Sequence, residues 1–384
     1  MFKFLKIILK SKFIFKNVDK SDIVIFDCEG KDAIEALILN KNYKILSVRY
    51  EKISEIYVNF IILKFIFLNF FKFSLKQLYL ISLIKSLSPK IVITHIPHSI
   101  DFSIVAKYYE KKIKFIALQH GHHDIYSLEK KQKEQIYIPE FFCFSKYEKK
   151  IYEKVGFKIK NFYPIGSLRA SLSKEYMIKN KNNSEIVYDI CLISEYSPSK
   201  KKLFPGPDGL QLIPSYQDHV GKIAYFCHKI KNEENLRLIF CGDAGPNSVY
   251  QKIENDFYSK FLKDFNYKIL QENRSTFPTY INLLKSRIVI GGYSTVLREA
   301  IGLDKKILSC NFTKNPILDF PLNGICLFKK NNYQEFKDIV MKILSMKDKE
   351  YFEKINSLKE KEFLMENCHK TANLIRDKLN QYLY

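Results

Sequence analysis

The fold is decided by one stretch of the chain, Arg287-Ile-Val-Ile-Gly-Gly-Tyr-Ser-Thr-Val-Leu-Arg-Glu-Ala-Ile-Gly-Leu-Asp-Lys-Lys-Ile-Leu308. Its β-branched run at 288–290 predicts a buried parallel strand. Gly291 and Gly292 follow, where the backbone can turn tightly because no side chain is in the way. Ser294 suits the N-cap of a helix with an apolar stripe, and the apolar end of the stretch predicts the next strand. The stretch is therefore predicted to be a β-α-β unit.

The turn between this strand and this helix is a candidate anion site. Backbone N–H groups and the positive helix end converge there. Ser294 and Thr295 lie at the start of the helix, and Glu299 lies one turn further in, where a carboxylate can reach the hydroxyls of a ribose. Short glycine motifs also occur in β-α-β units that bind nothing. From spacing alone, a purely structural turn is an equal alternative.

Short apolar runs alternate with helical patterns along most of the chain. Strands are predicted at 22–26, 43–48, 90–94, 114–118, 188–193, 236–240, 267–270, 288–290, 306–310 and 324–328. Helices are predicted between them, with a long apolar helical stretch at 56–88 and two polar helices, 333–346 and 348–382, at the end. Apolar strands that alternate with helices predict parallel sheets covered on both faces.

The length of the chain predicts two domains. Its 384 residues exceed one typical compact core. The segment 166–188 is largely polar and is predicted to contain a linker. We therefore expect an α/β protein of two Rossmann-like doubly wound domains facing a cleft. The first domain is expected at 1–170, the linker at 171–186 and the second domain at 187–345.

The composition leaves several partners open. The formal net charge is +22, and the chain is rich in Lys, Ile, Asn, Phe and Tyr and lacks Trp. Nucleic acid, anionic lipid or an anionic substrate would each suit the positive charge, and an A·T-rich genome would give the same bias. No basic recognition helix or aromatic platform motif is found, so we expect no nucleic-acid partner.

No metal or cofactor is expected. The eight cysteines form no C-x-x-C pair and are not grouped as zinc ligands. Those in or beside predicted strands, Cys191, Cys241 and Cys310, suit small buried hydrophobic positions. This cysteine usage is typical of a reducing cytosol.

Two segments bear on membrane association. Lysines interrupt the apolar residues of 1–10 and no cleavage site follows, so we expect no export. The segment 56–73 is the most apolar of the chain, but Lys64 at its centre argues against a bilayer span. Its aromatic residues and flanking lysines suit the surface of an anionic membrane. We expect a cytoplasmic protein bound peripherally to a membrane.

A histidine-rich loop follows the predicted strand 114–118. The loop reads Gln119-His-Gly-His-His-Asp124 and lies at the carboxyl end of the strand. His120 is our candidate for an acid–base or acceptor-orienting group, because imidazole titrates near neutral pH. His122 and His123 alternatively cap the next segment. The spacing is too tight for one loop to supply a tetrahedral metal site. Further along, Ser145 and Glu148 predict a helix-capping box.

The second half has three further candidate residues. Glu195 follows the strand 188–193 in a loop with Ser194, Ser197, Ser199 and Lys200 to Lys202 that suits a sugar and its phosphate or is simply solvated. Asp243 follows the strand 236–240 and is a candidate nucleophile or cation stabiliser, or begins an Asx turn. Arg274 is a candidate phosphate ligand.

Three motifs resemble one enzyme type. The pattern Gly292-x-Ser-Thr-x-x-x-Glu-Ala300 after a strand resembles the donor motif of GT-B glycosyltransferases, which holds a nucleotide phosphate and its ribose. Gln119-His-Gly121 and the segment 142–167, which ends in Tyr163-Pro-Ile-Gly-Ser167, resemble CDP-glycerol polymerases and Kdo transferases of capsule and lipopolysaccharide synthesis. In those families the histidine loop lines the acceptor side.

The resemblance implies a bacterial, metal-independent glycosyltransferase of surface polysaccharide synthesis, peripheral at the inner membrane. The donor would be a nucleotide-activated sugar, with CMP-Kdo-like donors favoured, and the acceptor a growing glycan or a lipid-linked molecule. A C-terminal helix within 346–384 would pack back towards the N-terminal domain. A nucleotide-sugar 2-epimerase, which shares the fold, and a glycerophosphate-type polymer transferase remain alternatives.

Overall fold

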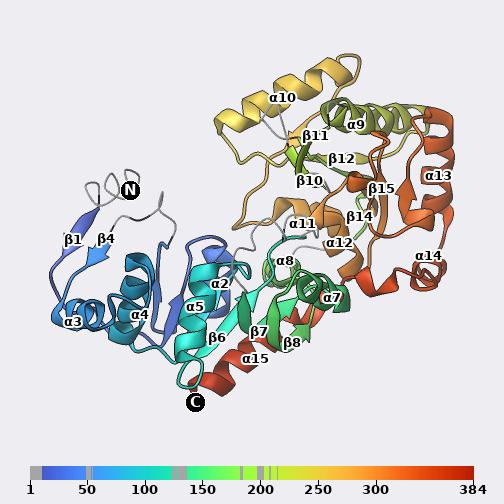
Figure 1. Cartoon of the computed structure of the whole chain (residues 1–384). Coiled ribbons are helices and arrows are strands. Elements are labelled where there is room, and N and C mark those ends of the chain that lie inside the picture. The colour runs from blue at the N-terminus through green and yellow to red at the C-terminus, as the bar shows by residue number, and fades with distance from the viewer. Residues whose placement is uncertain are drawn as a thin grey trace.

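Two parallel six-stranded sheets organise the computed structural model of the chain (Figure 1). The structure describes residues 11–48, 53, 55–122, 128, 136–181, 185–196, 203–206, 209–213 and 215–384. Residues 1–10, for which no export is expected, lie outside the described residues. So do His123 and Asp124 of the histidine loop and the predicted sugar-loop residues Ser197, Ser199 and Lys200 to Lys202.

The first sheet has the order β3-β2-β5-β6-β7-β8. Its strands are β2 (Ile23–Ile25), β3 (Tyr43–Ile45), β5 (Ile91–Thr94), β6 (Lys114–Leu118), β7 (Tyr137–Cys143) and β8 (Lys158–Pro164). The helices α2 (Lys31–Leu37), α4 (Leu75–Leu87), α5 (Ile100–Tyr109) and α7 (Lys146–Lys154) connect them. On β5, Val92 faces one core, whereas Ile91 and Ile93 face another. Both faces are therefore covered, as predicted.

The second sheet has the order β13-β12-β9-β14-β15-β16. Its strands are β9 (Tyr188–Ile193), β12 (Leu238–Cys241), β13 (Ile269–Leu270), β14 (Ser286–Gly291), β15 (Lys306–Cys310) and β16 (Leu327–Phe328). The helices are α9 (Tyr216–Glu233), α10 (Val249–Leu262), α11 (Pro278–Leu284), α12 (Thr295–Gly302), α13 (Tyr333–Ser345) and α14 (Asp348–Asn356). When the six strands are numbered in chain order, their order across the sheet is 3-2-1-4-5-6, which is the Rossmann order. The order reverses between β9 and β14.

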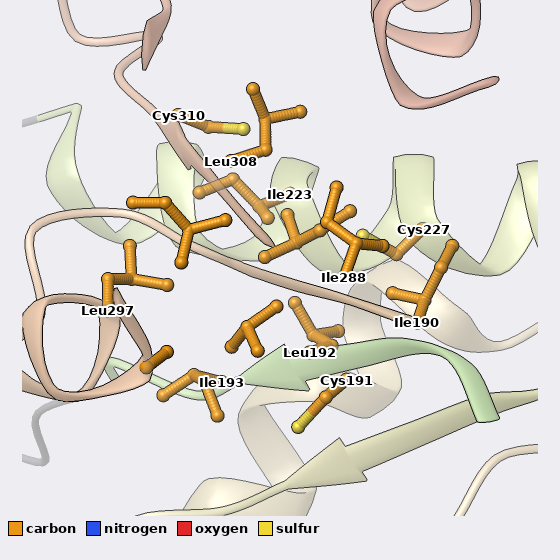
Figure 2. Packing of buried hydrophobic residues seen from close by; sticks show 14 of the residues in the cluster. Ile190, Cys191, Leu192, Ile193, Ile223, Cys227, Ile288, Leu297, Leu308 and Cys310 are labelled. Carbon is orange, nitrogen blue, oxygen red and sulfur yellow. The ribbon is translucent and has the colours of Figure 1, made fainter. Parts of the chain in front are cut away.

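Figure 2 shows how the core of this second domain is packed. Ile190 and Leu192 of β9 and Ile288 of β14 lie near Ile223 and Cys227 of α9, and all of them belong to one buried cluster. Burying each aliphatic side chain contributes roughly 1.5–3 kcal/mol. The cysteines predicted to be small hydrophobic residues are buried and free, and burial raises the pKa of the Cys310 thiol.

The predicted linker 171–186 is largely wrong at the level of secondary structure, because it is helical as far as Lys179. Helix α8 (Leu168–Lys179) is capped by Ser167, whose hydroxyl accepts from the amide of Ala170. Leu172 and Met177 are buried on its inner face, where α8 packs against α11, α12 and α15. The polar composition concealed these few apolar positions, which are enough to fix the helix.

The predicted single helix 348–382 is also wrong. After α14, the chain forms short 3₁₀ turns at Lys361–Phe363 and Cys368–Lys370 before α15 (Thr371–Leu383). Helix α15 supplies apolar residues to one core of the first sheet, and Lys90 on that sheet donates to the carbonyl of Leu383. The C-terminus thus lies beside the first sheet, as Figure 1 shows.

The apolar segment 56–88 is not one helix. The strand β4 (Glu55–Tyr57) pairs with β1 (Lys12–Ile14), and α3 (Phe60–Asn69) comes next, followed by α4. The Pro-rich loop after Lys202 forms a small antiparallel pair, β10 (Leu203–Gly206) and β11 (Gly209–Leu212). Across the described ranges, no helix combines the length and the apolar character that crossing a bilayer requires.

Candidate nucleotide site at the switch point of the second sheet

The candidate site lies where the strand order of the second sheet reverses. Ligands of open α/β sheets bind beyond the carboxyl ends of the strands at this point. Glu195 lies two residues beyond the end of β9, and Gly291 is the last residue of the neighbouring strand β14. The sequence predictions for Glu195 and for the glycine turn therefore concern adjacent positions.

The carboxylate of Glu195 lies directly on the glycine turn. The amide of Gly292 donates to its Oε1 at 2.6 Å and the amide of Tyr293 donates to its Oε2 at 2.9 Å. A Cβ on Gly292 would lie 3.0 Å from that Oε2 and 3.0 Å from Nε2 of His219. Position 292 is therefore a glycine because a carboxylate and an imidazole approach its backbone closely.

Helix α12 begins at the predicted residue. Ser294 is its N-cap, and its hydroxyl accepts from the amide of Val296 at 3.3 Å. The next residue, Thr295, accepts on Oγ1 from the amide of His122 at 3.0 Å. The ring Nε2 of His122 lies 2.7 Å from the hydroxyl of Tyr293. The loop after β6 of the first domain thus contacts the glycine turn of the second.

A buried arginine on α12 connects the two domains. Arg298 has 1% of its surface exposed and donates to Glu148 at 2.7 Å, to the Ser145 hydroxyl at 3.2 Å and to the carbonyl of Phe363 at 2.9 Å. Glu148 also accepts from the amide of Ser145, which completes the predicted capping box of α7. The sequence analysis identified the box but missed Arg298, its partner from the other domain.

Arg298 also determines the tautomer and the charge of the His122 ring. It donates to Nδ1 of His122 at 3.0 Å, so the neutral ring carries its proton on Nε2, beside Tyr293. Burial, together with the Arg298 charge, holds the pKa of His122 well below its usual value. This side chain is therefore a neutral hydrogen-bonding link at physiological pH.

Glu299, the predicted ribose ligand, lies at the same junction. It is 3% exposed and accepts from the Ser167 hydroxyl at 2.6 Å and from the Tyr280 hydroxyl at 2.7 Å. Burial raises its pKa, and the two hydroxyls oppose that rise. Both carboxylate oxygens are therefore engaged within the chain, and a ribose would have to displace one of the hydroxyls.

His120 lies at the surface of the first domain. Its Nδ1 is 2.6 Å from the carbonyl oxygen of the buried His95, so Nδ1 carries a proton and, in the neutral ring, Nε2 carries the lone pair. Burial and the neighbouring His120 depress the pKa of His95 to about 3. This arrangement gives His120 the tautomer that a general base requires.

The other two candidates lie further along the sheet. Asp243 follows β12 and is exposed, and its amide donates to Glu254 at 3.1 Å. Glu254 also accepts from the Ser194 hydroxyl at 2.6 Å, so it holds the loops after β9 and β12 together. Arg274 is exposed in the turn after the edge strand β13. The structure brings Asp243 beside the switch-point loop but leaves Arg274 at the edge of the sheet.

Among the residues that the structure describes, no group of three or more His, Cys, Asp or Glu side chains could hold a metal ion. The amides of Gly292 and Tyr293 donate at the glycine turn, and such donors suit an anion.

Comparison with known proteins identifies the fold. No protein-family model matches the sequence, and a search of curated proteins finds no match. The wall teichoic acid polymerase TagF, in a variant soaked with CDPG, is similar in structure with a TM-score of 0.51 at 11% identity, over 99% of this chain and 92% of that chain.

Two other structures are similar over most of their length. A glycosyltransferase from Rickettsia africae ESF-5 gives a TM-score of 0.46 at 17% identity, over 95% of this chain and 99% of that one. The UDP-GlcNAc 2-epimerase from Neisseria meningitidis, bound to UDP-GlcNAc, gives 0.49 at 14% identity, over 94% and 99%. The likeness to TagF and the order of the strands confirm the predicted fold class, two Rossmann-like doubly wound domains of the GT-B type.

Proposed function

We propose that the protein is a glycosyltransferase that moves a sugar from a nucleotide-activated donor to a growing surface glycan or a lipid-linked acceptor. One observation carries the proposal: the histidine loop of the first domain contacts the glycine turn at the switch point of the second. His122 bonds to both Tyr293 and Thr295. His120, two residues earlier in the same loop, is thereby held near the place where a donor would bind.

The donor phosphate would bind at Gly291 and Gly292 and at the start of α12, with Ser294 and Thr295 as hydroxyl ligands. Amides and the helix end favour an anion there, so no metal is required to neutralise the leaving phosphate. Glu299 would receive the ribose hydroxyls, and Arg274 would add a charge from the β13 edge. The sequence resemblance to Kdo transferases favours a CMP-Kdo-like donor.

The chemistry would be divided between the two domains. His120 would act as the acid–base group towards the acceptor hydroxyl, because its Nδ1 donates to the carbonyl of His95 and leaves Nε2 basic. Glu195 and Asp243 would face the sugar from the second domain. A carboxylate in that position stabilises positive charge that develops at the anomeric carbon, or acts as a nucleophile in a retaining reaction.

The likeness of fold to TagF supports a second candidate, a glycerophosphate-type polymer transferase. Both activities need a nucleotide donor, and the identity of the donor separates them. Thermal unfolding with CMP, CDP, UDP and GDP would identify the nucleotide, because a bound ligand stabilises the folded state by mass action. If none of the four raised the midpoint, the proposal would fail.

Exchanging His120 for asparagine tests the catalytic assignment. We expect turnover to fall about 10²–10⁴-fold, which is the usual contribution of a general acid–base group. Nucleotide affinity should be unchanged, because His120 is assigned to the acceptor side. A loss of turnover below tenfold would assign His120 a structural role.

We also propose that the protein works at the cytoplasmic face of the inner membrane as a peripheral protein. Helix α3 supports this, because Phe60, Leu63 and Phe67 on it are exposed and Lys64 lies among them. An amphiphilic surface of aromatic and basic residues suits an anionic bilayer.

A further inference from the structure

The anion bound at the turn after β14 is a side chain of the protein, the carboxylate of Glu195. The carboxylate of Glu195 takes the amide protons of both Gly292 and Tyr293, at 2.6 and 2.9 Å. These two amides point to the switch point of the sheet, where a ligand of this fold binds. A donor phosphate and the Glu195 carboxylate would therefore compete for the same two hydrogen bonds.

A third hydrogen-bond donor faces the same turn. His219 on α9 is 2% exposed, and its Nδ1 accepts from the amide of Phe312 at 3.2 Å, so the neutral ring carries its proton on Nε2. Burial lowers the pKa of His219 to about 4, which keeps the ring neutral at pH 7. Nε2 would be 3.0 Å from a Cβ on Gly292, so its N–H faces the glycine turn.

Glu195 accepts from two of these three donors, the amides of Gly292 and Tyr293. A phosphate group has more acceptor oxygens and more charge than a carboxylate, so it can satisfy all three donors at once.

We propose that Glu195 is a stand-in for the donor phosphate. The phosphate displaces its carboxylate from the amides of Gly292 and Tyr293 and takes the Nε2 proton of His219 as a third hydrogen bond. This rests on the proposed function, since it assumes a donor with a phosphate group. The Tyr216 hydroxyl holds the backbone carbonyl of Glu195 at 2.9 Å, so only the side chain has to rotate.

The exchange would link donor binding to the arrangement of the catalytic groups. Once displaced, the Glu195 carboxylate is repelled by the phosphate. It turns away from the amides of Gly292 and Tyr293, towards the sugar that the phosphate carries. In the enzyme without a donor, the Glu195 carboxylate accepts from both amides. Glu195 then becomes available for chemistry only when a donor is in place.

Calorimetric titration with inorganic pyrophosphate tests the exchange, because this probe needs neither a sugar nor a base. We expect Glu195→Gln to bind pyrophosphate about tenfold more tightly than the wild type, because a neutral amide competes less well than a carboxylate for backbone N–H groups. Equal or weaker binding would overturn the proposal, since it would mean that Glu195 shapes the site and does not block it.

Two variants of His219 give an independent test if position 195 proves essential for folding. Glutamine keeps an N–H near Nε2, whereas asparagine keeps an acceptor near Nδ1. We expect His219→Gln to retain pyrophosphate affinity and His219→Asn to lose about tenfold. The opposite order would overturn the proposal. Pyrophosphate binding that follows this pattern without any transfer of sugar would refute the proposed function alone.

Discussion

Helices α12 and α3 are of similar length but have opposite surfaces. Helix α12 buries an arginine and a glutamate, with Arg298 1% and Glu299 3% exposed. Helix α3 exposes Phe67 to 83%, and Phe71 just beyond it is 98% exposed. In α12 each charged group has partners far away in the sequence: Glu148 for Arg298 and Ser167 for Glu299. Partners, and not hydrophobicity alone, therefore decide which side chains are buried.

The two helices also differ in whether their side chains have partners within the chain. The buried charges of α12 have partners within the chain: Arg298 pairs with Glu148, and Glu299 accepts from Ser167 and Tyr280. Helix α3 and the turn after it present Phe60, Ile61, Leu63, Phe67, Leu68, Phe70 and Phe71 as large exposed apolar side chains. Patches of this kind on a folded chain indicate contact with another surface.

The largest effect should come from Arg298→Met. Removal of the guanidinium leaves Glu148 buried and unpaired, and such a change costs about 3–5 kcal/mol. The matched control is Lys349→Met, whose 3.9 Å ion pair with Glu353 is exposed and contributes little. Chemical unfolding would measure both free energies. A cost below 1 kcal/mol for Arg298→Met would show that the junction is not held by this pair.

A smaller effect is expected for Glu299→Gln. If the carboxylate receives a ribose, loss of its charge should weaken nucleotide binding by roughly 1.5–3 kcal/mol. Ser167→Ala is the control, because it removes the hydroxyl that donates to Glu299 and caps α8, and it should lower stability by about 1–2 kcal/mol without affecting affinity. Equal nucleotide affinities for wild type and Glu299→Gln would assign Glu299 to the junction alone.

The junction around α12 should also respond to pH. The pKa of His122 is lowered because the ring is buried beside Arg298, so its stabilising contribution is complete above pH 6.5 and is lost as the pH falls below that value. The unfolding free energy should fall by up to about 1.4 kcal/mol per pH unit for this one group.

In His122→Asn this part of the pH dependence should disappear, because the amide oxygen still accepts from Arg298 but does not titrate. Unfolding at several pH values between 7.5 and 4.5 would compare the two proteins. His219, with a pKa lowered to about 4, contributes equally to both. Identical slopes would exclude His122 as the titrating group.

Substitutions of the exposed residues on and beside α3 should give the smallest change in stability. Phe67→Ser and Phe71→Ser should alter the unfolding free energy by about 0.5 kcal/mol or less, yet reduce sedimentation with anionic vesicles. Phe65→Ser, a 7% exposed neighbour on the same helix, should cost about 3–5 kcal/mol instead. High salt should release the wild type from vesicles, because basic residues contribute about 1 kcal/mol each only when unscreened. Release by detergent alone would contradict a peripheral association.

Local features of the sequence were predictable. The glycine turn, the Ser294 cap and the capping box at Ser145 depend on residues a few positions apart, and the structure has all three. The parallel strands were predictable because fully apolar runs bounded by polar residues have few other interpretations. The part of α8 that lies in the predicted linker was missed because the composition was considered without its few apolar positions.

Contacts between distant residues could not be predicted in this way. Arg298 and Glu148 are 150 positions apart, and Glu195 and Gly292 are 97 apart. Nothing local in the sequence distinguishes Arg298 from the other basic residues of a chain with 63 of them. The position of His219 beside Gly292 was missed for the same reason, since His219 is on α9 and Gly292 lies in the turn after β14.

The most direct test of the proposed function is whether donor consumption depends on an acceptor. The purified protein would be incubated with CMP-, CDP-, UDP- and GDP-activated sugars, with and without a glycan or lipid-linked acceptor, and the released nucleotide would be measured. The transferase proposal predicts nucleotide release from one donor only when an acceptor is present. Conversion of a UDP-sugar to its 2-epimer without any acceptor would contradict it.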